Sequence, residues 1–135
     1  MPAVVVDTSV VSFDFKGDTR AKLYHPHQAG RILVVSFMTV AELDLWAIER
    51  KWGRTRRNKM QLHLRRYVVH PFDRVLCLKW AEAMHSARRK GRPIQAADAW
   101  MAATALKLKA PLLTHNPRDF AAVDGLTVIT EAPRS

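Results

Sequence analysis

The sequence predicts an α/β fold with a central, mostly parallel β-sheet. Short apolar runs rich in β-branched residues alternate with longer segments of helical periodicity, which is typical of parallel sheets with helices on their faces. The run over residues 3–7 is continuous, as expected of a strand buried on both faces. The 135 residues, 48% of them hydrophobic, suit one globular domain. We therefore expect a single domain over residues 1–135, with a frayed tail at 131–135.

Five segments of the chain are predicted strands. Each is a short apolar run, and Val, Ile and Leu dominate most of them. The third run ends before Pro71, and the fourth begins at Pro111, positions at which proline is tolerated in a sheet. The predicted strands cover residues 3–7, 31–36, 67–69, 111–114 and 126–129.

The segments between the strands predict helices. Thr8 and Ser9, directly after the first strand, are residue types that cap helices. Thr39 and Glu42 have the spacing of a capping box, so we expect a helix that begins near Thr39. After it comes a strongly basic segment that also looks helical. These two helices are predicted to cover residues 39–52 and 54–66.

Two more helices are predicted in the second half of the chain. The first covers residues 74–90, where helical periodicity runs through Leu78, Ala81 and His85, and it ends near Gly91. The second is opened by Pro93 and continues to residue 108 with apolar residues at helical spacing. Strands and helices therefore alternate through most of the sequence, which supports the predicted α/β class.

The charge balance points to a polyanionic partner. The chain has 22 lysine and arginine residues against 12 aspartate and glutamate residues, a formal net charge of +10. Nucleic acid is the leading candidate, while a solvated basic surface or an acidic protein partner stays open. Residues 50–66 hold eight positive charges and no acid. This density fits a surface that follows a phosphate backbone, and it also fits a solvated helix face. The candidate RNA-binding residues are Arg54, Arg56, Arg57, Arg88 and Arg89.

Cysteine use and hydropathy favour a cytoplasmic protein. The single cysteine, Cys77, lies in an apolar run and is expected to be a small buried residue in a reducing compartment. The longest apolar stretch, residues 32–41, has ten residues, whereas a membrane-spanning helix needs about 20. Asp7 interrupts the apolar start of the chain, so no signal peptide is expected. We therefore expect no association with a membrane.

Four acidic residues are expected to meet at one edge of the sheet. Asp7 ends the first strand, Glu42 and Asp98 lie in the first turns of predicted helices, and Asp119 follows the fourth strand. Taken alone they have ordinary structural explanations: Glu42 as half of a capping box, Asp98 as a favourable charge at a helix N-terminus and Asp119 as a turn residue. Together, at the carboxyl ends of parallel strands, they would repel one another without a bound cation. Carboxylate oxygens suit Mg²⁺ or Mn²⁺, so the pattern indicates a metal-dependent nuclease.

Four segments carry a resemblance to a known family. They are Val-Val-Val-Asp-Thr-Ser at 4–9, Thr-Val-Ala-Glu-Leu at 39–43, Gly-Arg-Pro-Ile-Gln-Ala-Ala-Asp-Ala-Trp-Met-Ala-Ala-Thr-Ala at 91–105, and Thr-His-Asn-Pro-Arg-Asp-Phe at 114–120. In order and spacing, the chain resembles PIN-domain ribonucleases, and specifically VapC-type toxins of bacterial type II toxin–antitoxin pairs. The resemblance covers nearly the whole chain. It implies a PIN-like three-layer fold, in which helices flank the sheet.

The resemblance also implies an activity and its residues. The expected activity is that of an endoribonuclease that hydrolyses RNA phosphodiester bonds with a water activated by one or two Mg²⁺ or Mn²⁺ ions. A cognate antitoxin and a homodimer are implied as partners. Asn116 and Asp119 can share the fourth acidic role. The implied catalytic and metal-binding residues are Asp7, Glu42, Asp98 and Asp119, with supporting polar roles for Ser9, Thr114 and Asn116.

Other readings of the sequence remain open. A catalytically silent PIN-fold RNA-binding or regulatory protein would keep the fold without the chemistry. A phosphatase with Asp7 as nucleophile is disfavoured, because Ser9 stands where such enzymes usually carry a second aspartate. A DNA-binding helix-turn-helix is disfavoured as well, since no compact pair of helices stands apart from the strand pattern.

Overall fold

The computed structural model describes residues 2–134 and contains one five-stranded sheet with the strand order β3-β2-β1-β4-β5. All four pairings between neighbouring strands are parallel, so the carboxyl ends of the strands lie at one edge. The α/β class and the parallel sheet are therefore confirmed. The strands are β1 (Ala3–Val6), β2 (Ile32–Ser36), β3 (Val68–His70), β4 (Leu112–Leu113) and β5 (Val128–Ile129).

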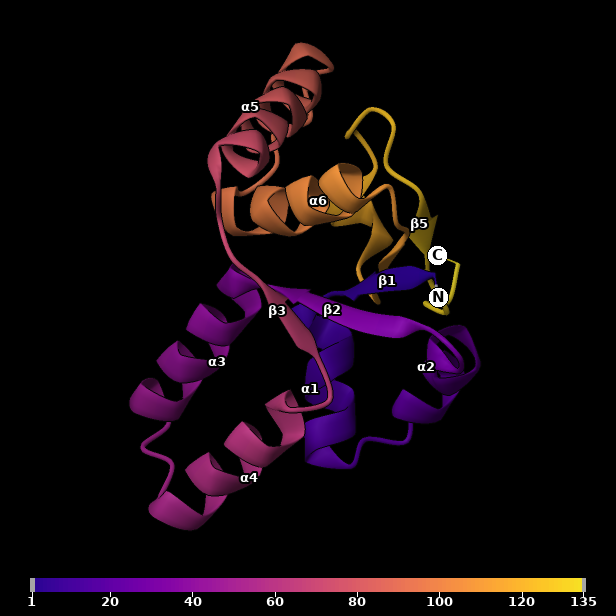
Figure 1. Cartoon of the computed structure of the whole chain (residues 1–135). Coiled ribbons are helices and arrows are strands. Elements are labelled where there is room, and N and C mark those ends of the chain that lie inside the picture. Colours follow the sequence, from indigo (N-terminus) through magenta and orange to yellow (C-terminus); the bar gives the residue numbers. More distant parts are fainter. Residues whose placement is uncertain (1, 135) are drawn as a thin grey trace.

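Helices cover both faces of the sheet, which gives the three layers expected from the resemblance. Figure 1 shows α5 and α6 on one face and α1 to α4 on the other. The connections from β1 to β2 and from β2 to β3 each run through two of these helices, because parallel neighbours need a crossover connection. The helices are α1 (Thr8–Lys16), α2 (Ala21–Gln28), α3 (Phe37–Glu49), α4 (Arg54–Leu64), α5 (Arg74–Arg89), α6 (Ala96–Leu108) and the short 3₁₀ helix η1 (Pro117–Phe120).

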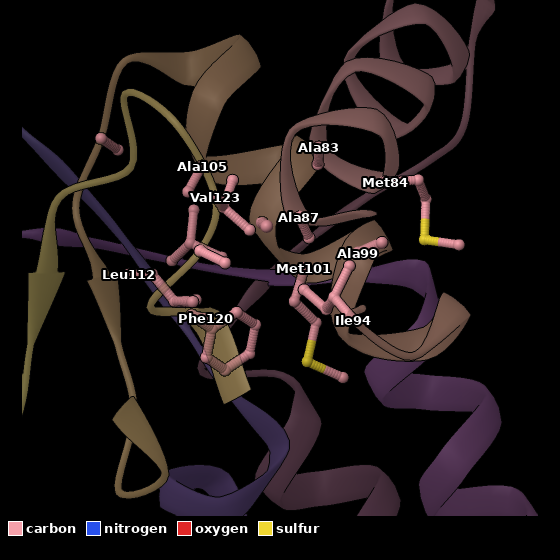
Figure 2. Close-up of a cluster of buried hydrophobic side chains, with 14 of the residues drawn as sticks. Ala83, Met84, Ala87, Ile94, Ala99, Met101, Ala105, Leu112, Phe120 and Val123 are labelled. Atoms are coloured by element: carbon pink, nitrogen blue, oxygen red, sulfur yellow. The ribbon is translucent and has the colours of Figure 1, made fainter. Parts of the chain in front are cut away.

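The core between the sheet and α5 and α6 depends on small side chains. Ala87 of α5 and Ala99 of α6 are fully buried, and these small residues allow the two helices to pack closely. Met101, Leu112 and Phe120 fill the space between α6, β4 and η1 (Figure 2). This packing fixes the start of α6 and the loop after β4, the two segments that carry Asp98 and Asp119.

The opposite face of the sheet is covered by larger side chains. Tyr24 of α2 and Leu43 of α3 are almost fully buried against Val4 and Val6 of β1. Val4, Val5 and Val6 have no exposed surface, so β1 is buried on both faces, as its continuous apolar run predicts. Helix α2 was not predicted, since it is short and has Pro26 in its interior.

Two predicted helix caps are wrong, and the difference bears on the site. Helix α3 begins at Phe37 rather than Thr39, because the hydroxyl of Ser36 accepts a 3.0 Å hydrogen bond from the backbone N–H of Met38. Helix α1 is capped by Asp7 rather than by Thr8 or Ser9. The threonine side chains are therefore available for other contacts.

The inward face of α5 also differs from the prediction. The helix begins where expected, capped by a hydrogen bond of 2.8 Å from the backbone N–H of Leu76 to Asp73. Leu76 and Ala83 face the core, whereas Leu78 is 52% exposed. The residue expected to be buried near it, Cys77, has intermediate exposure. The apolar residues of α5 lie on more than one face, so periodicity did not identify the buried one.

The end of the chain is partly held. Residues 131–134 form no helix or strand, but the backbone N–H of Glu131 donates a 3.1 Å hydrogen bond to the hydroxyl of Tyr24. The predicted frayed tail therefore begins with an anchored residue, and Ser135 lies outside the described residues. Between residues 2 and 134, none of the helices combines the length and the apolar character needed to cross a membrane.

Candidate active site

Asp7 lies at the centre of a hydrogen-bond network at the junction of β1 and α1. Its side chain is nearly buried, and its Oδ1 accepts a 2.8 Å hydrogen bond from the backbone N–H of Thr8. Its Oδ2 accepts hydrogen bonds from the hydroxyls of Thr114 at 2.6 Å and Ser9 at 3.0 Å. Burial raises the pKa of Asp7, the three hydrogen bonds partly offset that rise, and the charge of Asp119 adds to it.

Glu42 is joined to the same junction through Thr8. The hydroxyl of Thr8 donates a 2.7 Å hydrogen bond to Oε1 of Glu42 and lies 2.9 Å from the hydroxyl of Thr39. Because Thr8 has one hydroxyl proton and ionised Glu42 only accepts, Thr39 is the donor in the second bond. Burial raises the pKa of Glu42, Thr8 lowers it, and the charge of Asp7 raises it further.

Asp98 and Asp119 bring two further carboxylates into electrostatic range. Asp98 lies in the first turn of α6 and is partly buried, while Asp119 lies in η1 and is exposed. The pKa of Asp98 is raised to about 7, first by burial and then by the negative charges of Asp7, Asp119 and Glu42. Each of the four acids is therefore close enough to interact with at least one other, as the sequence predicts.

A polar cavity of about 260 Å³ lies beside Asp98 and Asp119. Gln95, Arg92 and Arg118 also line it. Positive side chains therefore lie next to two of the acids in this cavity. A phosphate group placed there would be close to both the arginines and the acids. Gln95 and Arg118 were not predicted as site residues, because neither their type nor their spacing distinguishes them from ordinary loop residues.

The four carboxylates do not form a closed metal cage as they stand. Among residues 2–134, no group of three histidine, cysteine, aspartate or glutamate side chains is arranged to hold a metal ion. The donor chemistry nevertheless fits a hard cation, because all four groups offer carboxylate oxygens and their mutual repulsion raises the pKa of Asp98. A cation at this edge would relieve that repulsion.

The predicted supporting residues have definite positions. Ser9 and Thr114 both contact Asp7, and the backbone N–H of Asn116 donates a 3.0 Å hydrogen bond to the hydroxyl of Thr114. The loop after β4 is thereby tied to β1. Thr8 is a further supporting residue that sequence reasoning treated only as a cap; its position directly after Asp7 is the signal that could have identified its role.

The predicted RNA-binding arginines lie on two other surfaces. The guanidinium of Arg57 donates hydrogen bonds to the carbonyl oxygens of Trp52 at 2.9 Å and Ala47 at 3.3 Å, close to the end of α3. That of Arg56 lies 4.5 Å from the ring centroid of Trp52. Arg57 therefore has a structural role. Arg54, at the start of α4, and Arg88 and Arg89, at the end of α5, are exposed.

Comparison with known proteins relates the sequence and fold of this chain to a known family. Residues 4–126 match the PIN domain. The chain is 35% identical over 95 residues to Ribonuclease VapC1 of Haemophilus influenzae strain R2866, and the match covers 70% of each chain.

Solved structures agree with this match. VapBC-1 from nontypeable Haemophilus influenzae superimposes with a TM-score of 0.81 at 27% identity, covering 95% of this chain and 97% of that chain. VapBC-5 from Mycobacterium tuberculosis, described as a member of the VapBC family of toxin–antitoxin systems, gives 0.69 at 26% identity, covering 98% and 100%. The chain therefore belongs to the PIN domain family and groups within it with the VapC proteins.

Proposed function

We propose that this protein is a divalent-metal-dependent endoribonuclease and the toxin of a toxin–antitoxin pair. The observation that carries the proposal is the cluster of four carboxylates, in which neighbouring negative charges contribute to raising the pKa of Asp98 to about 7. Membership of the PIN domain family and the similarity to Ribonuclease VapC1 support it. We place the whole activity in one domain over residues 1–135.

Asp7, Glu42, Asp98 and Asp119 are the residues that would hold one or two Mg²⁺ or Mn²⁺ ions. Their oxygen donors fit these ions, and the charge of Asp119 already acts on the buried carboxylate of Asp7. When bound, the metal lowers the pKa of a water molecule and offsets negative charge on the scissile phosphate.

The other polar residues act through these carboxylates. Ser9 and Thr114 hold the carboxylate of Asp7 in one orientation, and Thr8 does the same for Glu42. Each hydrogen bond also favours the ionised form of the carboxylate it contacts, which is the form that binds a cation. Asn116, three residues before Asp119, can share its role as the fourth ligand.

Positive charge on the surface would bring RNA to the acids. Arg92 and Arg118 line the cavity beside Asp98 and Asp119. The exposed residues Arg54, Arg88 and Arg89 would attract the phosphate backbone from further away. Arg56 and Arg57 would contribute charge, although their contacts near Trp52 also stabilise the fold.

The proposed function includes protein partners and a place in the cell. A cognate antitoxin would inhibit the enzyme, as the VapBC complexes suggest, and the cytoplasm is the compartment where RNA and antitoxin meet it. A second copy of this chain would cover the exposed apolar residues around β3 and the start of α5. These residues are Val68, Val69, Phe72, Val75 and Leu78.

The direct test is cleavage of RNA by the purified protein. Total RNA is incubated with the protein and Mn²⁺ or Mg²⁺, with and without a chelator, and the new ends are mapped by sequencing. We expect discrete cleavage sites that disappear with the chelator. If the protein binds RNA but does not cleave it with either metal ion, the result would support the catalytically silent alternative instead.

A further inference from the structure

A buried hydroxyl holds an imidazole at the flank of the acidic site. Tyr24 of α2 is fully buried, and its hydroxyl lies 2.5 Å from Nδ1 of His115. His115 directly follows Thr114, and its backbone N–H donates a 3.3 Å hydrogen bond to the hydroxyl of Ser9. Ser9 and Thr114 are both partners of Asp7. The imidazole is therefore anchored to the same backbone segments that position the buried carboxylate.

The hydrogen bonds of Tyr24 bear on which nitrogen of His115 carries the proton. The backbone N–H of Glu131 donates to the hydroxyl oxygen of Tyr24 at 3.1 Å, which leaves the single hydroxyl proton for another partner. The carbonyl oxygen of Thr114 is 3.4 Å away, a long distance for a hydroxyl donor, whereas Nδ1 of His115 is at 2.5 Å. We therefore assign the hydroxyl proton of Tyr24 to the shorter of the two contacts, the one with Nδ1, which in the neutral ring leaves the proton on Nε2.

Aromatic packing holds the ring of His115 in place. The ring of His115 meets Phe13 edge-on, with centroids 5.1 Å apart, and Tyr24 with centroids 5.7 Å apart. The guanidinium of Arg20 lies 4.2 Å from the centroid of the same Phe13 ring. These ring contacts hold the imidazole in one orientation.

We propose that Nε2–H of His115 donates a hydrogen bond to a phosphate oxygen of the bound RNA, and that Tyr24 is a positioning residue for it. The inference rests on the proposed function and adds a substrate contact to it. Nε2 lies on the ring edge away from Tyr24, and among residues 2–134 this nitrogen makes no hydrogen bond. A donor whose orientation is already fixed loses little entropy on binding.

Three substitutions test the Nε2–H donor of His115 separately from the bulk of its ring. The side-chain amide nitrogen of His115→Gln reaches the position of Nε2, whereas that of His115→Asn reaches only the position of Nδ1. Tyr24→Phe removes the hydroxyl that fixes the tautomer and keeps the buried ring. His85→Asn, on the exposed face of α5, is the matched control. Circular dichroism melting establishes which variants are folded at the assay temperature.

The measurements are RNA affinity and cleavage kinetics. Affinity is measured by fluorescence anisotropy with a short fluorescein-labelled single-stranded RNA of random sequence in the presence of chelator. We expect about tenfold weaker binding for His115→Asn, a smaller loss for Tyr24→Phe, and near wild-type binding for His115→Gln and His85→Asn. In the cleavage assay with Mn²⁺, KM should rise for His115→Asn with kcat little changed.

Three results would each overturn the inference. The first is equal RNA affinity of His115→Asn and the wild type. The second is an equal loss of affinity in the Asn and Gln variants. The third is a nitrogen-15 NMR spectrum of the imidazole that places the proton on Nδ1 in the wild type. If the wild type binds RNA without cleaving it, the proposed function fails, while the affinity series still tests the contact of His115.

Discussion

The hydroxyl of Thr114, at the end of β4, donates a 2.6 Å hydrogen bond to Oδ2 of Asp7, at the end of the neighbouring strand β1. The two residues are 107 positions apart in the sequence, and the parallel pairing of β1 with β4 brings them together. Thr114 has no exposed surface, so this bond forms away from competing water. The fold thus positions the buried acid of the site through an adjacent strand.

Replacing Thr114 tests the value of this bond. In Thr114→Val the volume is kept and the donor is lost, so one oxygen of buried Asp7 loses a partner. We expect a loss of about 1–2 kcal/mol in the free energy of unfolding at pH 7, measured by urea denaturation. The control, Thr114→Ser, keeps a hydroxyl and should lose less. Equal stability of the valine variant and the wild type would show that the bond contributes nothing.

The same variant should change the pH dependence of cleavage. The hydrogen bond from Thr114 lowers the pKa of Asp7, so its loss raises that pKa further. Because the ionised carboxylate is the form that binds a cation, the acidic limb of the rate profile should move to higher pH. Rates measured with Mn²⁺ across the neutral range check this shift, and an unchanged acidic limb in Thr114→Val would contradict it.

Asp98 makes the metal-free protein less stable as the pH rises. Its pKa is about 7 in the folded protein against 3.8 for an ordinary aspartate, so ionisation opposes folding. The loss begins above pH 3.8 and is complete above pH 7. Asp98→Asn should therefore be more stable than the wild type at pH 8 and not at pH 4. Because the side chain is partly exposed, we expect about 1–2 kcal/mol, less than the full shift implies. Urea denaturation at both pH values gives the difference in unfolding free energy between Asp98→Asn and the wild type. The same difference at pH 4 and pH 8 would contradict the raised pKa of Asp98.

Metal binding should reverse this loss. Mg²⁺ or Mn²⁺ relieves repulsion among the four carboxylates in the folded state alone, so the melting temperature in chelator-treated buffer should rise as the ion is added. The rise in melting temperature should be much smaller in Asp98→Asn than in the wild type. In the control Asp44→Asn, which alters an exposed acid on α3, the rise should equal that of the wild type. Differential scanning calorimetry measures both. A rise that is the same in all three proteins would indicate a metal site elsewhere.

In the basic helix α4, the test of RNA binding needs residues whose charge can be changed without loss of a structural contact. Arg54 and Lys59 are exposed, whereas Arg57 donates to the carbonyl oxygens of Trp52 and Ala47. Arg54→Glu with Lys59→Glu should reduce the slope of log K for RNA against log salt by about one per lost phosphate contact. Arg57→Ala should instead lower the melting temperature. An unchanged salt slope in the double variant would favour a merely solvated helix face.

The sequence predicted the sheet and the convergence of the acids, because both depend on the simplest patterns. A continuous valine run predicts a buried strand, and parallel strands bring their carboxyl ends together. The cap assignments failed where two signals compete, since Thr39 has the spacing of a capping box while Ser36 makes the cap. Thr39 and Thr8 instead serve the contact with Glu42.

The remaining differences come from tertiary contacts that no local pattern encodes. Helix α2 is short, contains Pro26 and is held by burial of Tyr24 against the sheet, so its own sequence predicts it weakly. The contact between Tyr24 and His115 joins residues 91 positions apart. In the sequence alone, only its place in the segment 114–120 relates His115 to the proposed site.

The measurement that tests the central claim most directly is RNA cleavage by Asp7→Asn. The asparagine fits the same space, and its amide can be met by the hydroxyls of Ser9 and Thr114, so the fold should persist by circular dichroism. We expect Mg²⁺- or Mn²⁺-dependent cleavage of RNA to be abolished in this variant and present in the wild type purified in parallel. Cleavage by a folded, contaminant-free Asp7→Asn protein at the wild-type rate would contradict the assignment of this carboxylate cluster as the active site.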